Sequence, residues 1–159
     1  MSVPNAYLSR RYRFAASHRL HVDALSPERN REMFGKCNNP FGHGHNYFLQ
    51  VTLAGPIDAE TGMVVNLADL DAFARTELLD RFDQVNLNED PAFRQAVPTT
   101  ENLCRELWRV FDRFAAQHAP VRLMRIRVEE TGNNSFDYFG EGAPGTALQP
   151  KLRKAMNAL

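Results

Sequence analysis

The chain has 159 residues, of which 43% are apolar and 24% are charged, and its 19 Lys and Arg residues balance 19 Asp and Glu residues. A chain of this size and composition forms one soluble globular domain, and its core needs no disulfide or metal support. The net charge of zero does not favour nucleic acid as a partner, and no apolar run approaches the roughly 20 residues that span a membrane.

The cysteine content and the first dozen residues indicate a cellular compartment. Cys37 and Cys104 are the only cysteines, too few for the disulfide framework of a secreted protein. Residues 1–12 lack the apolar core of a signal peptide. We therefore expect a cytoplasmic protein with two free thiols.

The first half of the chain predicts two strands and a helix. Residues 8–17 alternate polar and apolar side chains, as a half-buried strand does, and residues 45–54 repeat this pattern. Between them, residues 21–42 show neither a strand nor a helix period and are expected to form a long functional loop. Asn66 is a suitable N-cap for an amphipathic helix over residues 67–81.

The second half predicts a helix followed by two strands. Thr99 or Thr100 caps a helix that ends near Gln117. Residues 121–130 form the next strand, with Met124 on the apolar face and Leu123 on the polar face, and residues 135–139 form the last. This order favours an α+β fold in which two helices cover one face of an antiparallel sheet. We interpret residues 142–159 as a solvated C-terminal extension.

A cluster of histidines is the strongest functional signal. His43 and His45 are two residues apart and project to the same side of an extended strand. His18 ends the first strand on its apolar face, so strand pairing brings it beside the other two. These side chains alone could be hydrogen-bonded structural histidines, but three imidazoles on one face favour a catalytic metal site, with Zn²⁺ as the first choice.

Two further residues stand out near this cluster. Cys37 lies in the loop beside Lys36 and six residues before His43, where a nearby cation favours the thiolate that acts as a base or nucleophile. Glu130 continues the apolar face of its strand, so its carboxylate needs partners. It either forms a structural ion pair or accepts hydrogen bonds from a ligand such as the amidine-like edge of a pterin or guanine.

Several segments together resemble the 6-pyruvoyl-tetrahydropterin synthase family. They are FAASHRLH, FGKCNNPFGHGHNY, IDAETGMVVNLADL, PTTEN and VEETGNN, and the resemblance covers most of residues 8–141. Five residues separate Cys37 from the His-Gly-His motif. This spacing favours the pyruvoyl branch over 6-carboxytetrahydropterin synthase of the queuosine pathway, which often has a shorter one. We treat residues 1–159 as one pterin synthase-like domain.

The resemblance implies a fold, an assembly and a set of residue roles. The fold is the tunnelling fold, in which each subunit contributes a four-stranded antiparallel sheet and two helices to a barrel, and two trimers form a homohexamer with active sites between subunits. The roles are a zinc site at His18, His43 and His45, a catalytic base at Cys37, a pterin site at Glu130, Thr99, Thr100 and Glu101, and a catalytic pair at Asp83 and Gln84.

The implied activity is elimination of triphosphate from 7,8-dihydroneopterin triphosphate. The family has histidine after the catalytic aspartate, where this chain has Gln84, and glutamine cannot exchange a proton near neutral pH. We expect zinc and pterin binding with altered or reduced synthase activity. The alternatives are the carboxytetrahydropterin reaction, a pterin-binding protein without catalysis, and a structural zinc protein.

Overall fold

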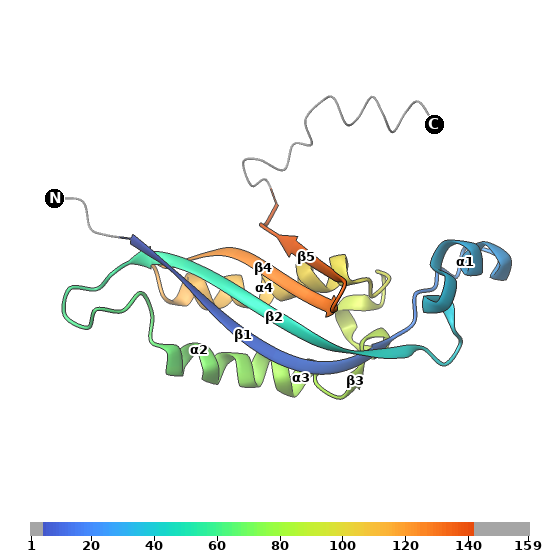
Figure 1. Ribbon diagram of the computed structural model, residues 1–159, viewed down its shortest axis with the longest axis horizontal. Coiled ribbons are helices and arrows are strands. Elements are labelled where there is room, and N and C mark those ends of the chain that lie inside the picture. Colours follow the sequence, from blue (N-terminus) through green and yellow to red (C-terminus); the bar gives the residue numbers. More distant parts are fainter. Residues whose placement is uncertain (1–4, 142–159) are drawn as a thin grey trace, which may run out of the picture.

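The computed structural model describes residues 5–141, which form one five-stranded sheet with helices packed against it (Figure 1). The strands are β1 (Asn5–His18), β2 (His43–Pro56), β3 (Val85–Asn86), β4 (Arg122–Thr131) and β5 (Asn134–Tyr138), in the spatial order β3-β1-β2-β4-β5. The expected C-terminal extension, residues 142–159, lies outside the described residues.

The sheet is mixed, so the prediction of four antiparallel strands is wrong in one respect. β1, β2, β4 and β5 pair antiparallel as expected, but β3 adds a short parallel pairing through Val85 and Asn86 against Ala16 and Ser17. A strand of two residues contains less than one full alternation of side chains, so no sequence period reveals it.

The long β1–β2 pairing places the histidine cluster. Fourteen residue pairs run from Asn5 opposite Pro56 to His18 opposite His43. Because side chains of a strand alternate between the two faces, His45 projects to the same face as His43. The register alone therefore brings three imidazoles to one end of the sheet.

The helices form where the sequence predicts them. α2 (Leu67–Ala74) continues through a π-helical turn, Arg75–Leu79, into α3 (Asp80–Phe82), and α4 spans Thr100–Gln117. Asn66 and Thr99 are the N-caps, each accepting a hydrogen bond from a backbone N–H of the first turn. Their apolar faces share one buried core with the inward side chains of the sheet, so these helices cover one face of it (Figure 1).

The segment 21–42 is not a plain loop. It contains α1 (Pro27–Phe34) and a 3₁₀ turn over Gly35–Asn38, beyond the end of β1 and β2 (Figure 1). Asn30 is the only buried residue of α1, and its side chain bonds the backbone of Val22 and Leu25. A helix held by a buried amide has no apolar stripe, which is why helical periodicity does not predict it.

A β-bulge corrects the predicted faces of β4. The register shifts between Thr52 and Leu53 of β2, opposite the start of β4. Leu123 is therefore buried in the core and Met124 is only half-buried, the reverse of strict alternation. From Ile126 onward the alternation holds, and Glu130 keeps its expected inward face. No helix in residues 5–141 is long and apolar enough to cross a membrane.

Candidate metal and substrate site

The three histidines predicted as metal ligands meet at the end of the β1–β2 pairing. One ring nitrogen of each of His18, His43 and His45 lies within 4.8 Å of the others. The Nε2 atoms of His18 and His43 are 3.2 Å apart. His18 is 2% exposed, and the other two are half-buried. The cluster is therefore compact and largely shielded from water.

Hydrogen bonds in this cluster leave ring nitrogens that suit a cation. His18 Nδ1 lies 2.8 Å from the carbonyl oxygen of Pro98, which can only accept, so Nδ1 carries the proton and the Nε2 lone pair faces the cluster. His43 Nδ1 and His45 Nε2 are buried without a partner among the described residues. Burial lowers the pKa of His18 and of His45. Neutral imidazoles with free lone pairs are the form that binds a divalent metal.

Glu130 brings a carboxylate to the same place. Its Oε1 lies 3.9 Å from His18 Nε2 and 3.8 Å from His45 Nε2. Thr100 donates a hydrogen bond of 2.6 Å to Oε1, and Asn134 donates one of 2.8 Å to Oε2. Burial favours the neutral acid, but these two bonds outweigh it and lower the pKa of Glu130. The group is an anion that keeps further lone pairs for a ligand.

The segment predicted to hold a pterin comprises residues 99–101, and its three side chains have different contacts. Thr100 is buried and bonds Glu130, as described above. The Thr99 hydroxyl accepts from the backbone N–H of Asn102, which makes it the cap of α4. Glu101 is exposed in the first turn of that helix. Within one chain, only Thr100 is brought to the histidines.

Tyr47 is a buried residue beside the histidines, and the sequence analysis does not single it out. Its ring centroid is 5.5 Å from that of His45 and 6.4 Å from that of His18. The hydroxyl is buried without a hydrogen-bond partner in residues 5–141. Its parity along β2, shared with His43 and His45, is the signal that could have identified it. A buried, unpaired hydroxyl beside the cluster can donate to a bound ligand.

Cys37 lies in the 3₁₀ turn and is half-buried. The turn is bound to the chain that follows His18, because Leu20 N–H donates to the Cys37 carbonyl (2.8 Å) and the Asn38 side chain donates to the Leu20 carbonyl (2.7 Å). Burial and the charge of Glu130 raise the pKa of the Cys37 thiol. This direction is opposite to the one expected from the position beside Lys36.

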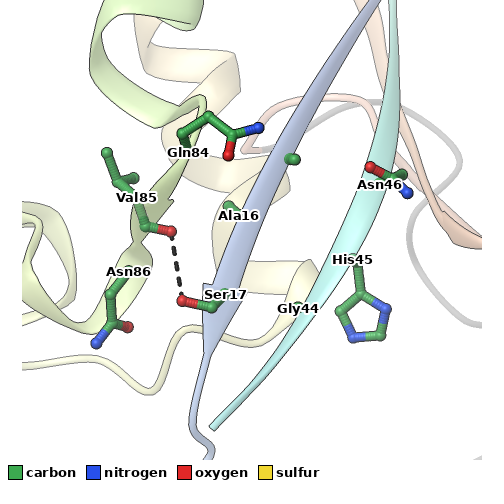
Figure 2. A pocket seen from close by; sticks show the side chains of 9 residues that line it. Ala16, Ser17, Gly44, His45, Asn46, Gln84, Val85 and Asn86 are labelled. Carbon is green, nitrogen blue, oxygen red and sulfur yellow. Dashed lines mark hydrogen bonds between the residues drawn. The ribbon is translucent and has the colours of Figure 1, made fainter.

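The predicted catalytic pair lies elsewhere. Asp83 accepts a hydrogen bond from the Ala15 N–H (2.7 Å), and Gln84 N–H donates to the Ala15 carbonyl (2.6 Å). Gln84 is exposed and has a left-handed backbone, with φ of 60°. Figure 2 shows it across the paired strands from His45, in a polar pocket that both residues line. Among the described residues, no hydrogen bond links Asp83 or Gln84 to Cys37.

Known proteins resemble this chain over most of its length. The sequence profile of the family described as 6-pyruvoyl tetrahydropterin synthase matches residues 7–141. The human protein named 6-pyruvoyl tetrahydrobiopterin synthase is 46% identical over 138 residues, which is 86% of this chain and 92% of the human one. The protein of that name from Drosophila melanogaster is 43% identical, over 86% of this chain and 81% of its own.

Solved structures give the same result. The structure of Caenorhabditis elegans 6-pyruvoyl tetrahydropterin synthase superposes with a TM-score of 0.81 at 38% identity, covering 88% of this chain and 99% of the other. The synthase from Plasmodium falciparum superposes with a TM-score of 0.54 at 13% identity, covering 86% of this chain and 98% of the other, which supports the fold alone.

Proposed function

The chain belongs to the 6-pyruvoyl tetrahydropterin synthase family, and we propose that it is a lyase that converts 7,8-dihydroneopterin triphosphate into 6-pyruvoyl-tetrahydropterin and triphosphate. The observation that carries the proposal is a cluster of three imidazoles, two of which, His18 and His45, lie within 4 Å of the Glu130 carboxylate. A cation site next to a carboxylate suits a substrate that has hydroxyl groups at one end and an amidine-like ring edge at the other. The whole chain, residues 1–159, is treated as one domain.

The histidines would hold the metal. His18 Nε2 and one nitrogen each of His43 and His45 are the ligands, and their chemistry suits zinc. Bound zinc would lower the pKa of the side-chain hydroxyls of the substrate. The Pro98 carbonyl keeps the His18 ring in the ligating tautomer.

Glu130 would hold the pterin ring. Its carboxylate accepts two charge-assisted hydrogen bonds from the ring edge, and Thr100 keeps it ionised and in position. Thr99 and Glu101 would complete the ring site, Glu101 from its exposed position in the first turn of α4. The unpaired hydroxyl of Tyr47 is a further donor at this site.

Cys37 would act as the base that removes a carbon-bound proton from the substrate side chain. Asp83 and Gln84 would then act on the Cys37 of a neighbouring subunit, since they lie apart from it within one chain. The sheet offers edges for such an assembly, because within residues 5–141 β1 has a partner on its outer side only at Ala16 and Ser17, and β5 ends the sheet. A barrel of three subunits, doubled to a hexamer, would use both edges.

The presence of Gln84 affects the turnover rate that we expect, but not the reaction that we propose. Glutamine cannot relay a proton, and loss of a general acid or base lowers rates by about 10²- to 10⁴-fold. We therefore propose a synthase of reduced turnover. The amide of Gln84 would still position a neighbouring group by hydrogen bonding.

The test is a product assay with zinc-loaded protein and 7,8-dihydroneopterin triphosphate, in which mass spectrometry identifies the products. Triphosphate release that Cys37→Ala abolishes, with a 6-pyruvoyl product, supports the proposal. Acetaldehyde among the products would instead select the carboxytetrahydropterin reaction. Tight pterin binding without turnover, at high protein concentration, would select a non-catalytic binding protein.

A further inference from the structure

We propose that a cavity beside the Cys37 turn binds the oligophosphate chain of the substrate, and that Arg31 of α1 is a principal ligand together with Arg19 and Lys36. The inference rests on the proposed function for the identity of the ligand. The cavity itself is defined by the positions of three cationic side chains and does not depend on the proposed function.

The cavity has a volume of about 360 Å³ and lies between α1, the 3₁₀ turn and the chain that follows β1. Its charged lining consists of Arg19, Arg31 and Lys36, and His21, Asn38 and Asn39 add polar groups. No carboxylate lines it. A concave surface with three cations and no acid attracts a polyanion.

These cations lie outside the salt bridges of the region. Among residues 5–141, Arg19, Arg31 and Lys36 form no ion pair, although the same region contains one between Arg29 and Glu32. The other arginines of the β1 region are engaged elsewhere: Arg10 pairs with Asp71 and Arg11 with Glu129, and Arg13 stacks on Phe48. Within residues 5–141, this cavity therefore gathers three cationic side chains that are not in salt bridges.

Arg19 is held in place at the wall of the cavity. Its Nε lies 3.4 Å from the Asn38 carbonyl oxygen, and its Nη2 lies 3.3 Å from His21 Nδ1. A guanidinium has five N–H donors, so several remain for phosphate oxygens. Ordering before binding reduces the entropy that binding costs.

The cavity adjoins the proposed active site along two chain segments. Arg19 directly follows the ligand residue His18, and Lys36 directly precedes Cys37. The bond from Leu20 N–H to the Cys37 carbonyl holds these segments together. A ligand with its hydroxyls at the histidines can extend its phosphates past Cys37 to these cations.

A second cavity shares Arg19 and His21 and includes Arg94, with a volume of about 470 Å³. Asp23 also lines it, and its side chain is fully exposed beside His21. A carboxylate at the rim repels phosphate, so the smaller cavity is the better oligophosphate site.

Calorimetry with inorganic triphosphate tests the site directly. We expect Arg31→Gln and Lys36→Gln each to weaken binding about tenfold or more, because each removes a charge-assisted contact. Arg29→Gln is the matched control, since it removes the same charge from the same helix outside the cavity. Absence of binding to the unaltered protein, or equal weakening by Arg31→Gln and Arg29→Gln, would overturn the inference.

Kinetics separates this inference from the proposed function. If both hold, Arg31→Gln raises KM for the triphosphate substrate about tenfold with little change in kcat, while affinity for a pterin without phosphates stays the same. Turnover with an unchanged KM in Arg31→Gln would sustain the proposed function and refute the phosphate site. Triphosphate binding that depends on Arg31, in a protein that shows no turnover, would sustain the phosphate site and refute the proposed function.

Discussion

His18 Nδ1 lies 2.8 Å from the carbonyl oxygen of Pro98, two residues before α4 begins. This bond connects the sheet with the segment between α3 and α4 and fixes which nitrogen of His18 faces the cluster. The orientation of the His18 ring therefore depends on how residues 83–98 are held.

Removal of one imidazole should abolish tight metal binding. We expect His45→Gln to weaken zinc binding by more than the 10- to 100-fold that loss of an outer hydrogen-bond partner typically causes. His118→Gln is the control, because His118 bonds Phe114 at the far end of α4. Zinc titration calorimetry provides the comparison, and equal affinity in the two variants would refute the three-histidine site.

Asp90 should make the protein sensitive to acid. Burial favours its neutral form, but hydrogen bonds from Arg81 and the Ala92 N–H outweigh it and hold the pKa of Asp90 below its usual range. The folded state therefore binds fewer protons than the unfolded state near pH 4. The stabilisation is complete above the unfolded pKa, about 3.9, and is lost as pH falls through the folded pKa.

The variant Asp90→Asn tests this dependence by urea unfolding at several pH values. At pH 7 it should lower the free energy of unfolding by about 1–3 kcal/mol, because Arg81 loses one of its two carboxylate partners and keeps only Glu106. The difference from the unaltered protein should shrink as pH falls toward 3. Asp80→Asn, an exposed position, should show neither effect. A difference that stays constant with pH would mean that the ionisation of Asp90 does not contribute.

Thr100 should control the ionisation of Glu130. Thr100→Val removes the 2.6 Å hydrogen bond to Oε1, so the pKa of Glu130 should rise and pterin affinity should fall by about tenfold. The upward shift in the acidic limb of the binding profile, measured by pterin fluorescence, separates this effect from a general loss of structure. Thr100→Ser keeps the donor and should bind as the unaltered protein does. A valine variant with an unchanged pH profile would contradict this role.

Much of the fold could be predicted from the sequence. Alternation located β1 and β2, and the caps at Asn66 and Thr99 located the starts of α2 and α4. These features are local or periodic. β3 and α1 were missed, since one is too short for a period and the other is held by the buried amide of Asn30.

The site was predictable in part for the same reason. His43 and His45 share a face by local spacing, and the strand pairing that adds His18 follows from antiparallel order. Pro98 and Asn134 lie in the PTTEN and VEETGNN segments, but nothing in those segments indicates their contacts with His18 and Glu130, which depend on three-dimensional packing. Such contacts between distant segments become visible only once the fold is known.

The last prediction concerns Gln84, whose backbone is left-handed with φ of 60°. Histidine is among the residues that tolerate this region best, and the exposed side chain leaves room for it. If the residue at position 84 relays a proton, Gln84→His should raise kcat by about 10²-fold or more and introduce a pH dependence near the pKa of histidine.

Two variants separate proton transfer at position 84 from backbone effects. Gln84→Asn keeps an amide and tolerates the left-handed region, and Gln84→Gly relieves any strain there, so neither should raise kcat. Turnover is measured as triphosphate release from 7,8-dihydroneopterin triphosphate by zinc-loaded protein. A histidine variant no faster than the unaltered protein would show that catalysis does not require a proton carrier at this position, and Gln84 would then be a positioning residue that acts through its amide.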